Sequence, residues 1–131
     1  MSEKELSKYY WLKKEVEDLE QRIIEFGVGV SSVNTDKLNV DGSAQYKSIQ
    51  EKIMELKDLW MNKRVSALEE YIKIESYIGN VEDTEIRQLL RYRFLDLKKW
   101  DEIDSLMCNG YNYSKKKYYK WKKVNLSHFI P

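Results

Sequence analysis

Apolar residues recur every three or four positions through two long stretches of the chain, which is the spacing of one face of an α-helix. In the first stretch, residues 2–26, the spacing is close to a heptad repeat, and Lys and Glu fill most positions between. Gly27 and Gly29 follow, and we expect them to end this helix. The apolar positions are Leu6, Tyr9, Leu12, Val16, Leu19, Ile23 and Phe26.

The second stretch predicts a helix from about Ser43 to Tyr77. Its apolar stripe consists of Ile49, Ile53, Leu56, Trp60, Ala67, Tyr71, Ile74 and Ile78, widened by Leu59, Leu68 and Ile72. Residues 1–78 are therefore predicted to form an antiparallel helical hairpin. Because the second helix is longer than the first, part of its stripe is expected to meet the C-terminal domain or a second copy of the chain. The long loop at 27–43 is either an arm docked on the hairpin or a partner, or a surface loop.

Residues 79–131 show shorter helical patterns. Asp83 is expected to cap a helix over Thr84–Leu95, and a second helix starts at Trp100. A turn over Cys108–Tyr113 separates it from a last helix, for which Ser114 is the expected N-cap. Short helix, turn and basic helix form the outline of a helix-turn-helix. The predicted core residues are Leu90, Phe94, Trp100, Ile103, Leu106 and Tyr118, with Arg87, Arg91 and Arg93 outside. The predicted fold is all-α: a long antiparallel helical hairpin followed by a small three-helix helix-turn-helix domain.

The last helix carries six lysines among ten residues. At 100° per residue, Tyr118, Trp121 and Phe129 share its inward face, and the lysines lie mainly on the opposite side. Lysine there can pair with phosphate, and tyrosine can contact a phosphate or a base edge. The candidate residues for binding double-stranded DNA are Lys115, Lys116, Tyr119, Lys120 and Lys123. The alternative is an ordinary solvated face, and without Arg on this helix the sequence favours phosphate affinity over base specificity.

Charge is distributed unevenly along the 131 residues. Residues 1–110 have a net charge of −5 and residues 111–131 a net charge of +6, which favours an anionic partner at the C-terminal end. The lone Cys108 excludes an internal disulfide and fits a reducing cytosol. There is neither an apolar run long enough for a membrane span nor a signal peptide, so we expect a cytoplasmic protein that does not enter membranes.

Catalytic patterns are sparse. One His and one Cys cannot build a zinc site of Cys and His ligands, and Asp and Glu alternate with Lys as on solvated helix faces. The Gly-x-Gly at 27–29 lacks the preceding strand of a dinucleotide site. We therefore expect neither enzymatic activity nor a cofactor or metal.

Several segments of the C-terminal part follow one known pattern: the run from Ile78 to Leu95, Trp100-Asp-Glu-Ile103, the Ser114-Lys-Lys-Lys-Tyr-Tyr-Lys-Trp-Lys122 helix and Leu126. Through these segments the sequence from Ile78 to Leu126 resembles a family of bacteriophage regulators with a domain similar to region 4 of sigma factors, the ArpU-like and RinA-like proteins. The family usually has Ala where this chain has Asp104. The resemblance implies a phage-encoded DNA-binding transcriptional regulator in a bacterial host, acting as a homodimer or with host RNA polymerase.

Two alternatives remain open. In the first, the chain is a protein-interaction module whose working surface is the hairpin; the −5 charge of residues 1–110 and the Asp104 departure favour it. In the second, it is a DNA-packaging protein similar to small terminase subunits, which also carry helix-turn-helix domains on helical stalks.

Overall fold

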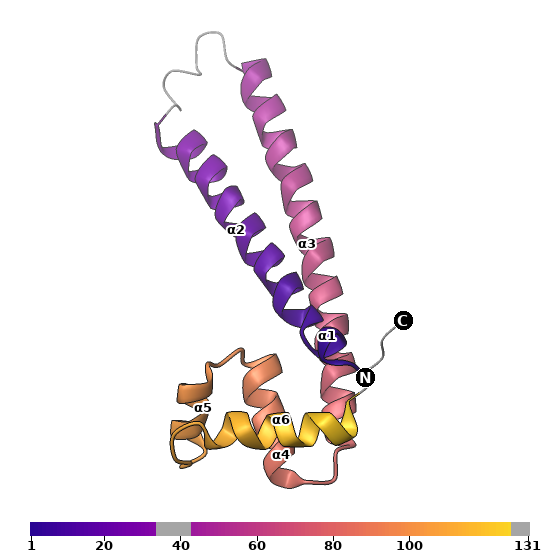
Figure 1. The fold of residues 1–131 in the computed structure, drawn as a ribbon. Coiled ribbons are helices and arrows are strands. Elements are labelled where there is room, and N and C mark those ends of the chain that lie inside the picture. The colour runs from indigo at the N-terminus through magenta and orange to yellow at the C-terminus, as the bar shows by residue number, and fades with distance from the viewer. Residues whose placement is uncertain (34–42, 127–131) are drawn as a thin grey trace. The chain divides into compact units, whose positions relative to one another are not determined.

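The computed structural model describes residues 1–33 and 43–126, and these are all helix, turn or connecting segments without a strand (Figure 1). The predicted all-α fold is therefore confirmed. The elements, in chain order, are α1 (Glu3–Leu6), α2 (Lys8–Val33), α3 (Ser43–Gly79), α4 (Thr84–Leu90), the π-helix η1 (Arg91–Leu95), α5 (Trp100–Leu106) and α6 (Tyr113–Asn125). The chain divides into two compact units, one formed by residues 12–67 and the other by residues 1–11 together with 68–131.

The predicted first helix is interrupted near its start. Ser2 caps α1, its hydroxyl accepting from the amide of Glu5 at 3.2 Å, and a turn at Ser7 separates α1 from α2. The prediction that Gly27 ends the helix is wrong, because α2 continues to Val33. Glycine adopts helical dihedrals at a cost of about 1 kcal/mol, which a long helix tolerates. The rest of the predicted loop, residues 34–42, lies outside the described residues.

In the unit of residues 12–67, α2 and α3 run antiparallel (Figure 1), as the two stripes predict. Glu15 of α2 forms an ion pair with Lys63 of α3 at 2.9 Å. Few apolar side chains in this unit are fully covered: Ile53 and Ala67 are buried, whereas Phe26 is 60% exposed. The described part of this unit therefore has only a thin apolar core.

The other unit contains a continuous apolar core. Leu6 from α1 and Ile74 and Ile78 from the end of α3 are fully buried there. They join Ile86, Leu89, Leu90, Phe94, Leu95, Ile103, Tyr118 and Leu126. The two compact units therefore do not meet at the predicted boundary at residue 78. The start of the first long helical segment, up to residue 11, and the end of α3, from residue 68, belong to the same unit as the C-terminal helices.

Asp83 caps α4 as predicted, its carboxylate accepting from the amides of Glu85 at 2.9 Å and Ile86 at 3.2 Å. The predicted helix over Thr84–Leu95 is α-helical only to Leu90 and continues as the π-helix η1. One extra residue per turn rotates the following side chains relative to an α-helix.

The three arginines predicted to lie outside are half-buried and held by specific partners. Arg87 donates to the Val81 carbonyl at 2.6 Å, and Arg91 pairs with Glu75 of α3 at 2.8 Å. Arg93 donates to the carbonyl of Lys98 at 3.1 Å. All three lie outside the buried core, as predicted, and the oxygen atoms of these partners hold each guanidinium in place.

Two residues that were predicted to lie in the core are not fully buried. Leu106 is 50% exposed, and Trp100 is only partly buried against the core. Leu106 is the last residue of α5 and is followed directly by the connection to α6. Leu90, Phe94, Ile103 and Tyr118 are buried as predicted.

Candidate nucleic-acid interface

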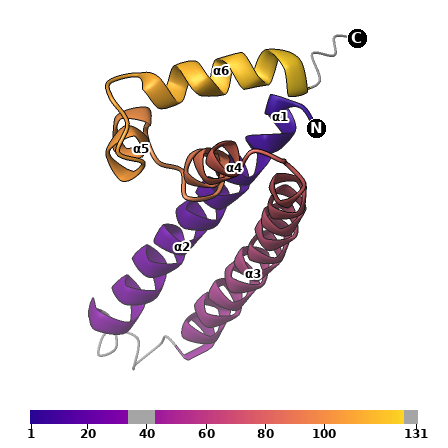
Figure 2. The same cartoon turned by 90° about the horizontal axis from the view of Figure 1, so that it is seen from below.

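The helices α5 and α6 and the connection between them form the predicted helix-turn-helix. Figures 1 and 2 show α6 lying across this unit, with α4 and α5 beside it. The connection spans residues 107–112, and two of its residues, Cys108 and Asn112, have left-handed backbone conformations with φ of 57° and 59°. Asn adopts this conformation more readily than most residues, which suits Asn112 to the position directly before α6.

Asp104 of α5 fixes the start of α6. Its side chain is buried, and its two carboxylate oxygens accept from the amides of Asn112 at 3.0 Å and Ser114 at 2.9 Å. These amides belong to the first turn of α6, whose donors have no partner inside the helix. A carboxylate there also interacts favourably with the helix dipole. Asp104 thus anchors α6 to α5.

This geometry corrects the predicted role of Ser114, which lies inside α6 and is fully buried. Its hydroxyl accepts from the side-chain amide of Asn109 at 3.0 Å, and its own amide donates to Asp104. Burial of Asp104 acts to raise the pKa of that carboxyl, but the hydrogen bonds from Ser114 and Asn112 outweigh it, and the pKa is lowered from its ordinary value.

The inward face of α6 packs on the core through Tyr118, which is 1% exposed. Its ring centroid lies 5.7 Å from that of Phe94 and 5.4 Å from that of Trp100. Burial raises the pKa of the Tyr118 hydroxyl, and the charge of Glu3 adds to the effect. Trp121 is partly buried as predicted, and Phe129 lies outside the described residues.

Lys117 and Lys122 of α6 form ion pairs with other helices. Lys117 pairs with Glu85 of α4 at 2.5 Å, and this hydrogen bond raises the pKa of Lys117. Lys122 pairs with Glu3 of α1. Both ion pairs tie α6 to neighbouring helices and draw two positive charges away from the outer face.

The five candidate residues lie together on the exposed part of α6. Lys115, Lys116, Tyr119, Lys120 and Lys123 are all exposed. Tyr119 is 42% exposed, and two cations lie near its ring: the Lys115 ammonium is 6.0 Å and the Lys122 ammonium 5.2 Å from the ring centroid. Four exposed ammonium groups on one helix of thirteen residues form a compact positive surface, which attracts polyanions.

Asp104 has a structural role that helical periodicity does not predict, and the resemblance marks it only as a departure from the usual Ala of the family. The sequence does contain one indication of this role, because an acidic side chain shortly before a turn that contains Asn and Ser can reach the backbone amides of that turn. The role of Asp104 depends on the turn conformation, which the sequence alone does not specify.

Comparison of the chain with protein-family models, curated proteins and solved structures finds no match. Within residues 1–33 and 43–126, no helix is long and apolar enough to cross a membrane. The same residues contain no group of three or more His, Cys, Asp or Glu side chains arranged to hold a metal ion.

Proposed function

We propose that the protein is a DNA-binding regulator that contacts duplex DNA through the exposed lysines of α6. The observation that carries this proposal is the exposure of four lysines on the outer face of α6, namely Lys115, Lys116, Lys120 and Lys123. Lys117 and Lys122 are only partly exposed and pair with Glu85 and Glu3. The second helix of a helix-turn-helix is the element that enters the major groove in proteins of this class.

The chemistry of this face favours phosphate contacts. Each ammonium is a point charge that pairs with phosphate without reading a base. Tyr119 is the one residue of the candidate set with a planar, hydrogen-bonding side chain, and we assign it the contact with a base edge or a phosphate. The resemblance to phage regulators supports a role in phage transcription, as a homodimer or together with host RNA polymerase.

The test is a titration of the protein on random-sequence duplex DNA at several salt concentrations. Replacing Lys116, Lys120 and Lys123 together by Ala is expected to flatten the slope of log affinity against log salt. Each lysine that displaces one counterion contributes about 0.9 to that slope, so the total change is about 2.7. Because phosphate contacts carry no base information, the loss of affinity is expected to be similar on all sequences.

The matched control is the double variant Lys117→Ala and Lys122→Ala, which removes lysines of the same helix that face Glu85 and Glu3. The control is expected to retain the wild-type slope, with circular dichroism reporting the fold of both variants. An unchanged slope in a folded triple variant would show that the exposed lysines are merely solvated. Tyr119→Ala is expected to lower discrimination between sequences more than overall affinity.

A second candidate function is a protein-interaction module, which includes a part of a DNA-packaging assembly. It is favoured by the apolar side chains exposed on α3, among them Met61, Val65 and Leu68, which are 48%, 48% and 58% exposed. This surface and the lysine face lie on different elements, so the salt titration distinguishes the two functions. We propose self-association through α3 as part of the leading function as well.

A further inference from the structure

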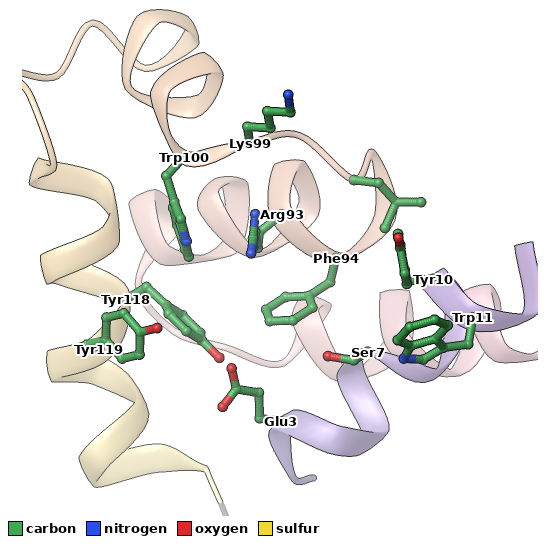
Figure 3. Close-up of a pocket in the computed structure, with 11 residues that line it drawn as sticks. Glu3, Ser7, Tyr10, Trp11, Arg93, Phe94, Lys99, Trp100, Tyr118 and Tyr119 are labelled. Atoms are coloured by element: carbon green, nitrogen blue, oxygen red, sulfur yellow. The ribbon is translucent and has the colours of Figure 1, made fainter. Parts of the chain in front are cut away.

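A cavity of about 470 Å³ opens beside α6, between residues of α1, the start of α2, η1 and the segment leading into α5 (Figure 3). All of its lining residues belong to the unit of residues 1–11 and 68–131. Its volume lies within the range of small-molecule sites, about 300–1,000 Å³. The proposed DNA contact uses none of this cavity except Tyr119 at its margin.

The charge of the lining is positive. Arg93 and Lys99 contribute two cations, and the single carboxylate, Glu3, is already paired with Lys122. Arg93 uses one N–H on the Lys98 carbonyl, and a guanidinium carries five such donors. Lys99 is exposed at the rim, where its ammonium meets solvent (Figure 3). An anionic group is therefore the charge-complementary occupant of the rim.

The walls also offer a stacking surface. Trp11 is 60% exposed, and Tyr10 approaches its ring edge-to-face, with centroids 4.9 Å apart. Trp100, by contrast, is contacted by the Arg93 guanidinium at 4.7 Å and by the Tyr118 ring. Trp11 is thus the indole whose ring is available to a planar ligand, and stacking on such a ring is tolerant of the identity of the partner.

A buried polar group completes the cavity. The hydroxyl of Tyr118 points toward the Glu3 carboxylate (Figure 3), yet it makes no hydrogen bond within the described part of the chain. The Tyr118 side chain is 1% exposed, so its hydroxyl is a buried polar group at the wall of the cavity. Together, the Tyr118 hydroxyl and the Glu3 carboxylate provide one donor and one acceptor, which match the polar edge of a nucleobase.

We propose that this cavity binds a nucleotide, with the base stacked on Trp11 and its polar edge at Tyr118 and Glu3, and the phosphate at Lys99 and Arg93. A planar ring with hydrogen-bonding edges and a negative charge a short distance away uses all three features of the lining. The same chemistry has two sources: a free mononucleotide, or an unpaired nucleotide at the end of a nucleic-acid strand. The site is separate from phosphate binding by the outer face of α6.

The experiment is calorimetric titration of the full chain with adenosine 5′-monophosphate. Adenosine and inorganic phosphate, which each present half of the ligand, are expected to bind at least tenfold more weakly. Trp11→Ala and Lys99→Gln are each expected to weaken binding of the nucleotide about fivefold or more. Lys57→Gln, which changes an exposed lysine of α3 that does not line the cavity, is the matched control and is expected to bind the nucleotide as the wild type does.

The arms of the experiment separate the sources and the competing occupants. A 5′-phosphorylated single-stranded oligonucleotide that binds no better than the mononucleotide indicates a free nucleotide, and one that binds tenfold better through Trp11 indicates a strand end. If phenylacetate binds as tightly as the nucleotide, the cavity recognises only an aromatic ring with a nearby carboxylate, and the assignment of a nucleotide is wrong. It is also wrong if neither nucleotide form binds, or if folded Trp11→Ala and Lys99→Gln proteins bind like the wild type. The same two variants are also titrated with duplex DNA. If they still bind the duplex, a failure of the nucleotide proposal is not a failure of the proposed DNA contact by α6.

Discussion

Asp104 is the residue on which the geometry of the helix-turn-helix depends. Its buried carboxylate accepts from two backbone amides at the start of α6, at 3.0 Å and 2.9 Å. Hydrogen bonds to a charged acceptor contribute about 1.5–3 kcal/mol, and an amide left without a partner in a buried position costs a similar amount. A single side chain therefore sets the position of the helix that presents the candidate DNA contacts.

Replacing Asp104 by Ala is expected to lower the free energy of unfolding by about 1–3 kcal/mol, because both amides lose their acceptor. Urea denaturation at pH 7, followed by circular dichroism, measures this change. The control is Ser105→Ala, an exposed neighbour on the same helix, for which we expect a change within about 0.5 kcal/mol. Equal stability of the Asp104→Ala variant and the wild type would contradict the anchoring role.

Replacing Asp104 by Asn tests the charge. Because the hydrogen bonds lower the pKa of Asp104 in the folded state, its ionised form is favoured by folding. That contribution is complete above the unfolded pKa of about 3.9 and is lost as the pH falls through the lower folded value. The stability difference between wild type and Asp104→Asn is thus expected to narrow from pH 7 toward pH 3 in denaturation series. A difference that stays constant over this range would show that the charge of Asp104 contributes nothing.

At the scale of single residues, helical periodicity predicts which side chains of a helix are buried and which are exposed. The inward position of Tyr118 and the exposure of Lys116, Lys120 and Lys123 follow from 100° per residue. The role of Asp104 was not predictable in this way. Its partners are backbone amides, and the position of these amides depends on the conformation of the turn before α6. In that turn Cys108 has a left-handed backbone conformation, which no sequence pattern predicts.

At the scale of elements, the short helix α1 fastens the start of the chain to the C-terminal core. Leu6 is fully buried among core residues, and Glu3 pairs with Lys122 of α6. The aromatic rings of Tyr9 and Tyr71 then meet edge-to-face, with centroids 5.3 Å apart, where α2 begins. Burial of one large side chain is the main favourable contribution of an element of only four residues.

Leu6→Ala is expected to destabilise the protein by about 2–5 kcal/mol, the range for deleting a fully buried leucine side chain. Leu106→Ala is the matched control: the same change at a residue that is 50% exposed, for which the loss is expected to be below about 1 kcal/mol. Thermal and urea denaturation of both variants provide the measurement. Similar losses for the two variants would mean that α1 does not stabilise the core.

The existence and order of the long helices were predictable, whereas their ends were not. The turn at Ser7, the continuation of α2 to Val33 and the π-helical turn at Arg91–Leu95 all depart from the predicted bounds. Glycine weakens a helix without forbidding it, so Gly27 did not mark an end. The π-helix places the guanidinium of Arg93 over Trp100, a tertiary contact that periodicity cannot reveal.

At the scale of the whole molecule, charge and apolar surface are segregated along the chain. The +6 charge of residues 111–131 coincides with the exposed lysines of α6, while α3 exposes a separate apolar stripe. Its members are Met54, Met61, Val65, Leu68 and Ile72, each between 48% and 58% exposed. Their spacings of seven, four, three and four residues match the seam of a coiled coil. The sequence predicted the uneven charge and an uncovered part of the α3 stripe, which included Leu68 and Ile72, but it did not predict the exposure of Met54, Met61 and Val65.

We predict that two copies of the chain associate through this stripe on α3. Isologous pairing removes the same apolar surface from water on both copies, which is the commonest solution for an exposed stripe of this kind. Sedimentation at tens of micromolar is expected to give twice the 15.8 kDa of one chain. Val65→Lys places a charge in the centre of the stripe and is expected to give a monomer. Ser66→Lys, which adds the same charge at the next, exposed position of the helix, is expected to stay dimeric. A wild-type monomer under these conditions, or equal behaviour of the two lysine variants, would rule out association through α3, and duplex binding would then be expected to involve one copy of α6.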